Sequence, residues 1–310
     1  RPPQAESLAR LRQAFTAAPE MLQKKRDVAA VLAKLKAEFP DLHDFEREFP
    51  SLCFALATGV GKTRLMGAFI AYLHLAHGIS NFFVLAPNLT IYNKLIADFT
   101  PNTPKYVFKG ISEFNLNPPR VIIGDNYEQQ SANMANLFGE INVNIFNISK
   151  INSEVRGGKE PRIKRMREVL GDSYFNHLAN LPDLVLLMDE SHRYRAQAGM
   201  RAINELNPLF GLELTATPFT ESHKGPVAFQ NVVMHYPLAQ AMHDGFVKMP
   251  AAVTQRDFNA RNYTPAEIEK IKLEDGVRLH ENTKAELQTY AHANGVAVIK
   301  PFMLVIARDT

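Results

Sequence analysis

The sequence predicts an α/β protein built on a mostly parallel sheet with helices on both faces. Short apolar runs recur between residues 51 and 215, and each is followed by a turn and a stretch with helical spacing. Near-continuous apolar runs are typical of strands that are buried on both faces, and their alternation with helices favours parallel pairing. The expected strands are 52–57, 81–86, 106–108, 120–124, 143–148, 184–188 and 212–215.

The segments on either side of this region have a different pattern. Apolar residues at spacings of three and four predict helices over 4–18 and over about 21–39, the second of which Pro40 ends. Residues 264–293 are predicted to form a charged helix, and an apolar strand is predicted at about 301–307. We therefore expect four parts. They are an N-terminal helical extension (1–49), an α/β lobe (50–245), a helical connector (246–298) and the first strand of a further lobe (299–310).

Composition and charge limit the kinds of partner and the cellular location that we expect. The 310 residues carry a net charge of +3, which permits a phosphate-bearing partner without requiring one. The single cysteine, Cys53, falls in the first expected strand and allows no internal disulfide, which fits a reducing cytosol. No apolar run is long enough for a membrane-spanning helix and no signal peptide is evident, so a cytoplasmic location is expected. Because the chain opens on Arg1 rather than Met, we expect a piece of a longer protein.

A glycine-rich turn follows the first strand. It reads "TGVGKT", from Thr58 to Thr63, and a helical stretch comes next. Glycines let backbone N–H groups converge on phosphate oxygens, and a helix N-terminus adds a favourable dipole. Lys62 is expected to contact the β- and γ-phosphates of ATP, and the Thr63 hydroxyl to bind Mg²⁺. The full pattern has glycine where this chain has Leu56, so the alternative is a glycine turn that happens to precede a lysine. The expected nucleotide-binding residues of the turn are Thr58, Gly59, Val60, Gly61, Lys62 and Thr63.

Two adjacent acids end the strand "LVLLM". Asp189 is placed to hold Mg²⁺, and Glu190 to act as general base toward a water in line with the γ-phosphate. Two neighbouring carboxylates repel each other unless a cation compensates, which Mg²⁺ would do. The alternative is a solvated acidic loop. His192 is either a loop histidine without a task or a hydrogen-bonding link to the next motif.

With "ATGVGKT" (57–63), "DESH" (189–192) and "TATP" (215–218) in that order, the chain resembles the superfamily-two DEAD/DEAH-box helicases and translocases. The most similar group is the helicase (Res) subunit of type III restriction enzymes. This resemblance implies a RecA-like fold, with a second RecA-like lobe beginning near the end of the chain. It also implies ATP and Mg²⁺ as cofactors, double-stranded DNA as partner, and a possible modification methyltransferase subunit in a prokaryotic cytoplasm.

Further residues gain roles by the same resemblance. Thr215 and Thr217 would couple the nucleotide to nucleic-acid contacts, and Gln4 of "RPPQ" would recognise adenine. The candidates for contact with the nucleic-acid backbone are Pro87, Asn88, Ser149 and Lys150. These four have ordinary alternatives, since Pro-Asn is good turn chemistry and Ser-Lys can start a helix.

The resulting expectation is an ATP-dependent DNA translocase or helicase. Two alternatives stay open, an RNA helicase and an ATP-gated binding module that does not translocate. A P-loop kinase or transporter ATPase is disfavoured by "TATP". The relatives also carry a nuclease domain, but no Glu-x-Lys tripeptide occurs in these residues, so nuclease activity is not predicted for them.

Overall fold

The computed structural model describes residues 1–123, 140–147, 174–195, 203–222, 225–249, 253–256 and 258–306. The chain divides into two compact units, Arg1–Met249 and Pro250–Thr310. The N-terminal segment, predicted as a helical extension, lies within the first unit. Its helices place Leu11, Phe15 and Leu35 in the same hydrophobic core as the strands.

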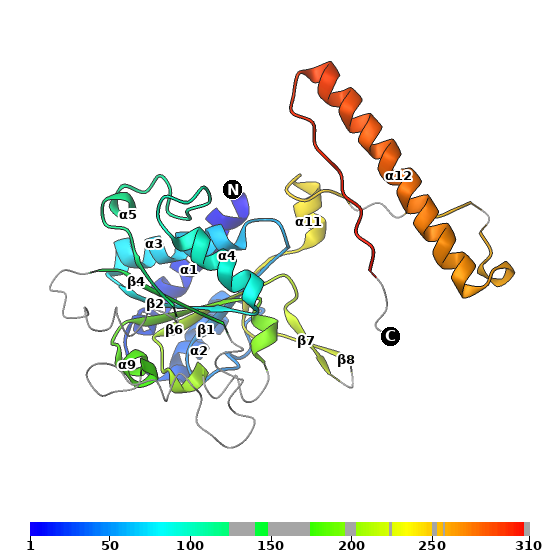
Figure 1. Ribbon diagram of the computed structural model, residues 1–310. Helices are drawn as coiled ribbons and strands as arrows, with labels where there is room; N and C mark the ends of the chain where they lie inside the picture. Colours follow the sequence, from blue (N-terminus) through cyan, green and yellow to red (C-terminus); the bar gives the residue numbers. More distant parts are fainter. Residues whose placement is uncertain are drawn as a thin grey trace. The chain divides into compact units, whose positions relative to one another are not determined.

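Seven strands form the sheet of the first unit, in the order β3-β4-β2-β5-β6-β1-β9, and every pair in it is parallel (Figure 1). This confirms the predicted α/β fold. The strands are β1 (Ser51–Leu56), β2 (Asn81–Ala86), β3 (Arg120–Ile123), β4 (Asn142–Asn147), β5 (Leu184–Asp189), β6 (Phe210–Thr215) and β9 (Val232–Tyr236).

Helices cover both faces of the sheet, as Figure 1 shows for α3 and α4 on one side and α9 on the other. The described helices of this unit are α1 (Pro2–Ala17), η1 (Pro19–Leu22), α2 (Val28–Glu38), α3 (Lys62–His77), α4 (Leu89–Phe99), α5 (Ser112–Leu116), α9 (Tyr174–Asn180), η2 (Ser191–Tyr194) and α11 (Leu238–His243). Successive side chains of a strand point to opposite faces of the sheet. Val84 packs in the core beneath α1 to α5, whereas Leu85 packs with Tyr174 of α9.

The second predicted helix, 21–39, is wrong in its first third. η1 ends at Leu22, and α2 begins only at Val28. Asp27 is the reason, because its carboxylate accepts hydrogen bonds from the N–H groups of Ala29 and Ala30 and so caps a new helix.

The predicted strand at 106–108 is also wrong, since these residues form turns without a strand partner. The Val107 N–H donates to the carbonyl of Asp98 at the end of α4 (2.9 Å). A side chain at Gly67 of α3 would meet Val107 Cβ at 2.7 Å. The apolar residues here therefore pack against helices and not within the sheet.

Three strands lie outside the predicted set. β9 is an edge strand of the sheet, and β7 (Phe219–Ser222) pairs antiparallel with β8 (Gly225–Ala228) in a separate two-stranded sheet. The apolar run "VVMHY" was the overlooked signal for β9.

The second unit contains η3 (Ala260–Asn262) and the long helix α12 (Pro265–Asn294). Thr264 caps α12 with a reciprocal capping box to Glu267, which confirms the predicted start. The described residues after α12, 296–306, form no strand, although one was predicted at about 301–307. A strand needs a neighbour to satisfy its backbone hydrogen bonds, and no described strand lies in this unit to provide one.

A buried ion cluster connects β6 to its surroundings. The Glu213 carboxylate is fully buried and pairs with Arg47 (3.3 Å) and with Arg195 (2.8 Å). It also accepts hydrogen bonds from the Ser51 hydroxyl (2.8 Å) and the Asn231 amide (3.1 Å). Burial opposes the ionisation of Glu213, but the two guanidinium groups outweigh it and lower its pKa to about 2. Cys53 is buried in β1 opposite Glu213 in the strand register.

We predict that replacing Glu213 with Ala destabilises the first unit by about 3–5 kcal/mol, because the buried guanidinium groups of Arg47 and Arg195 each lose an ion-pair partner, although Arg195 keeps its pair with Glu46. Urea unfolding measures this loss. Glu6→Gln is the matched control, since the Glu6–Arg10 pair is exposed and should contribute less than about 1 kcal/mol. If Glu213→Ala lowered the free energy of unfolding no more than the control does, Glu213 would not be the stabilising centre of this ion cluster.

The same carboxylate predicts a pH dependence. Its pKa is lowered in the folded protein relative to about 4.3 in an unfolded chain. Its stabilisation is therefore complete above that value and is lost as the pH falls toward 2. Urea midpoints measured between pH 5 and pH 2.5 should fall less steeply for Glu213→Gln than for the unaltered protein.

Candidate functional site

Four neighbouring strands bring the sequence motifs to one edge of the sheet. The order β2-β5-β6-β1 is parallel throughout, so the carboxyl ends of these strands lie side by side. The glycine turn follows β1, Asp189-Glu190 end β5, "TATP" begins at the end of β6, and Pro87-Asn88 follow β2. Ligand sites of open α/β sheets lie at this edge.

The turn after β1 has the backbone of a phosphate cradle. Gly59 and Gly61 have φ values of +86° and +103°, in the region that glycine adopts without strain. Gly61 is the N-cap of α3 and provides no side-chain cap, so the first N–H groups of the helix are left for a ligand. Thr58 is exposed at the start of the turn, whereas Val60 is fully buried and anchors it.

Gln4 of α1 reaches this turn across the fold. Its side-chain amide donates to the carbonyl of Val60 (2.6 Å), and Nε2 lies 3.1 Å from where a Cβ on Gly61 would be. Gln4 Oε1 is buried and has no hydrogen-bond partner among the described residues. The amide is thus fixed beside the cradle with one acceptor unused.

Lys62 and Glu190 meet at the centre of the edge. The Lys62 ammonium lies 3.2 Å from Glu190 Oε1, and its side chain is only 10% exposed. Glu190 has a left-handed backbone (φ 51°, ψ 54°), which costs a non-glycine residue free energy. Such strain often occurs at functional positions, although Glu46, Asn102 and Asn207 also have positive φ.

Asp189 is the more buried of the two acids. Burial, together with the neighbouring Glu190, raises its pKa to about 6, although Lys62 and Lys94 act in the opposite direction. Its Oδ1 atom is buried without a hydrogen-bond partner in the described part of the chain. An orphaned, partly desolvated carboxylate oxygen beside lysines is a suitable ligand for a hard cation.

His192 joins the acids to the "TATP" turn. Its Nδ1 atom lies 3.0 Å from the Thr215 hydroxyl and 3.2 Å from the Thr217 hydroxyl. Burial lowers the pKa of His192, and Glu190, 3.6 Å away, only partly offsets this effect. A neutral imidazole can accept a hydrogen bond from either threonine, so this is the link expected between the two motifs.

Lys94 of α4 was not predicted from the sequence. Its ammonium donates to the Thr63 hydroxyl (3.1 Å) and lies 3.7 Å from Asp98 Oδ2. Nothing in the sequence marks it, because the contact depends on how α4 packs beside α3. The edge therefore carries Asp189, Glu190 and two lysines, with Asp98 beside Lys94.

The structure describes two of the four predicted nucleic-acid residues, Pro87 and Asn88. Asn88 is the N-cap of α4 and accepts a hydrogen bond from the Ile91 N–H (2.9 Å), which is the turn chemistry weighed as its alternative. Pro87 is half-buried beside it. Ser149 and Lys150 lie outside the described residues. Contact of any of the four with nucleic acid stays a prediction.

The residues at this edge fit Mg²⁺ bound together with a nucleotide. No group of three His, Cys, Asp or Glu side chains in the described ranges could hold a metal ion by itself. The edge offers the Thr63 hydroxyl and Asp189, which is how Mg²⁺ is usually held, with phosphates and water completing its shell.

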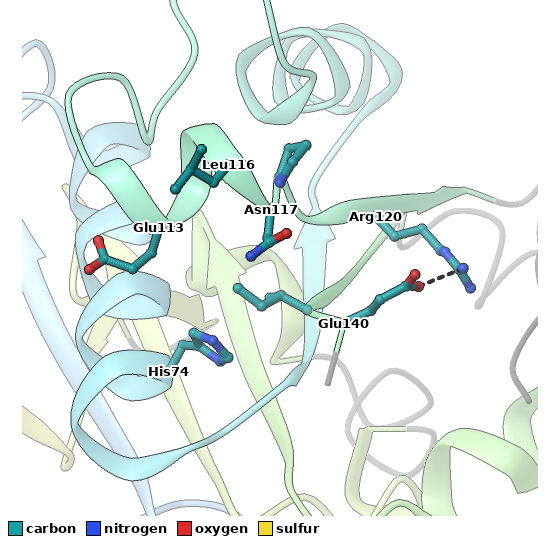
Figure 2. A pocket seen from close by; sticks show the side chains of 8 residues that line it. His74, Glu113, Leu116, Asn117, Arg120 and Glu140 are labelled. Atoms are coloured by element: carbon teal, nitrogen blue, oxygen red, sulfur yellow. Dashed lines mark ion pairs between the residues drawn. The ribbon is translucent and has the colours of Figure 1, made fainter. Parts of the chain in front are cut away.

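A separate cavity of about 760 Å³ lies at the other end of α3 (Figure 2). None of the predicted site residues lines it. Its charged groups include Arg120 and Glu140, which pair with each other at 2.6 Å. Its remaining lining is His74, Glu113, Leu116, Asn117, Pro118 and Ile141.

Comparison with known proteins places the chain in a family. The profile described as "Type III restriction enzyme, res subunit" matches residues 1–220, more than two thirds of the chain. The chain belongs to this family. A comparison with curated proteins gives no match. None of the described helices is long and apolar enough to cross a membrane.

Three solved structures resemble the Res-family chain in fold alone. The Sulfolobus solfataricus SWI2/SNF2 ATPase core in complex with double-stranded DNA is 15% identical, with a TM-score of 0.32 over 55% of this chain and 28% of that one. The ATP-dependent type ISP restriction-modification enzyme LlaBIII bound to DNA is 15% identical, with a TM-score of 0.41 over 71% of this chain and 16% of that one. A nuclease-deletion mutant of the type ISP restriction-modification enzyme LlaGI in complex with a DNA substrate mimic is 16% identical, with a TM-score of 0.42 over 72% of this chain and 18% of that one. The chain spans less than a third of each of these proteins.

The glycine turn gives a prediction for nucleotide binding. Gly61→Ala should remove binding of a fluorescent ATP analogue, because its φ of +103° disfavours a side chain and the new Cβ would lie 3.1 Å from Gln4 Nε2. Gly78→Ala is the control. Gly78 also has a positive φ, +68°, but the space around it is open. Both variants should lose more than about 1 kcal/mol of stability, and only Gly61→Ala should lose the nucleotide. Equal nucleotide binding by the two variants would contradict the assignment of this turn as the phosphate-binding site.

Proposed function

We propose that this chain carries the ATP-hydrolysing lobe of a duplex-DNA translocase or helicase, in a type III or related restriction enzyme. The observation that carries the proposal is the approach of Lys62 and Glu190 to 3.2 Å, with Asp189 next to them. Two motifs more than 120 residues apart thus share one charge cluster beside a glycine cradle.

The binding step follows from the groups around the turn. The backbone between Gly59 and Thr63 would hold the phosphates, and Lys62 would exchange Glu190 for phosphate oxygens. The unused Oε1 of Gln4 is an acceptor suited to the amino group of adenine, while its amide stays on Val60. Thr63 and Asp189 would hold the metal ion.

The chemical step is attack of water on the γ-phosphorus of ATP with cleavage of its bond to the β-phosphate oxygen. When bound, Mg²⁺ neutralises phosphate charge and stabilises the leaving diphosphate. The Glu190 carboxylate, once Lys62 has turned to the phosphates, is free to orient the water and accept its proton. Lys62 stays as the fixed positive charge on the transferred group.

A transmission route is supported by the bonds of His192. The imidazole follows Glu190 by two residues and contacts both threonines of "TATP". A shift of Glu190 on hydrolysis would reach Thr215 and Thr217 through it. Backbone contacts position a nucleic acid without reading its sequence, so the polymer, DNA or RNA, has to be decided by measurement. A methyltransferase partner is part of the type III proposal.

We predict that Glu190→Gln keeps ATP binding but slows hydrolysis by about 10²–10⁴-fold, because the general base is lost while the size of the side chain hardly changes. Lys62→Ala should lose binding itself. Glu221→Gln is the matched control, since Glu221 is exposed on β7 and outside the site. The measurements are equilibrium nucleotide binding and phosphate release.

Phosphate release with duplex DNA, single-stranded DNA or RNA tests the rest of the proposal. Preferential stimulation by duplex DNA supports the translocase. Stronger stimulation by RNA would replace it with an RNA helicase. Binding without turnover in the full-length protein, unchanged by Glu190→Gln, would favour an ATP-gated binding module.

A further inference from the structure

Lys94 acts with Lys62 to lower the pKa of Asp189, against the effect of burial. It comes from α4 and not from any of the motifs that end the strands. Its hydrogen bond goes to the Thr63 hydroxyl, at 3.1 Å, which is the oxygen assigned to the metal. A positive charge from another helix thus occupies the neighbourhood of the metal position.

The same ammonium has a second partner within reach. Asp98, one turn further along α4, lies 3.7 Å away, which is longer than a direct hydrogen bond. The Asp98 side chain is 9% exposed, while that of Lys94 is 50% exposed and free to change its torsion angles. Lys94 therefore lies between two acceptors and is bonded closely to only one.

A metal ion and this ammonium cannot share the Thr63 hydroxyl without cost. Mg²⁺ binds oxygen ligands at about 2.1 Å, so an ion on Thr63 would lie within about 5 Å of Lys94 in its present position. Repulsion between the two cations favours withdrawal of Lys94, and Asp98 offers it a compensating charge.

We propose that Lys94 is a positioning residue that stands in for the metal at the Thr63 hydroxyl and moves fully to Asp98 when Mg²⁺ binds with a nucleotide. This inference rests on the proposed function. It gives α4, the helix that begins after Asn88, a direct response to occupation of the metal site.

The test is the Mg²⁺ concentration that gives half-maximal binding of a fluorescently labelled ADP, a measurement that involves no turnover. Lys94→Met should lower this concentration about three- to tenfold, because the competing cation is gone. Asp98→Asn should raise it about two- to fivefold, since Lys94 then has no charged partner to move to. Lys94→Met/Asp98→Asn should behave like Lys94→Met.

Lys109→Met is the matched control, as Lys109 is an exposed lysine of the same unit, and it should leave the Mg²⁺ requirement unchanged. Lys94→Arg keeps the charge and should remain near the unaltered protein. An unchanged or raised requirement in Lys94→Met would overturn the inference. So would an Asp98→Asn effect that persists in the double variant. Absence of ADP binding by the unaltered protein at any Mg²⁺ concentration would instead defeat the proposed function, and this inference with it.

Discussion

The candidate site depends on the parallel register of four adjacent strands. Ala55 of β1 pairs with Thr215 of β6, and Leu214 of β6 pairs with Asp189 of β5. This alignment ends the strands at nearly the same level, so that the turns that follow can touch. A slip of one residue would reverse the face of every side chain in the shifted strand. The buried Glu213 cluster opposes such a slip, because it bonds groups from β1, β6 and the segment before β9.

Charge balance is the second condition of the site. Asp189 and Glu190 bring two carboxylates to a partly buried edge, and Lys62 and Lys94 bring two ammonium groups. Asp98 adds a third carboxylate beside Lys94, so each of these acids has a lysine nearby that offsets part of the cost of its burial. A triphosphate with its metal ion would rearrange these pairs, since each lysine has an acidic partner and a second possible partner.

Most of the sheet could be predicted from the sequence, because buried parallel strands are apolar along their whole length. The failures have local causes. "YVF" is apolar because it packs on helices, and the segment before α2 is interrupted by a cap at Asp27. The β9 run lies within the predicted lobe, but no strand was predicted after 212–215 because the motifs end there. The unpaired segment 301–306 is apolar like a strand but has no described partner strand.

The candidate site also contains some residues that could be predicted from the sequence and others that could not. The glycine turn, the two acids and the threonines were predictable because their spacing is local and each follows a strand. The contact of Gln4 with Val60 was not, since it joins residues 56 positions apart. Lys94 could not be found either, as its relation to Thr63 arises only when two helices pack on one face of the sheet.

The burial of Cys53 has a practical consequence. It is the only cysteine in the sequence, it is 0% exposed, and burial, together with the nearby Glu213, raises its pKa well above the ordinary value for a thiol. Alkylating reagents attack the thiolate and need access to it. The native chain should therefore be inert to maleimides, and a cysteine introduced on the surface of either unit would take up a fluorophore selectively. The two units could be labelled as a donor and acceptor pair without first removing a native residue.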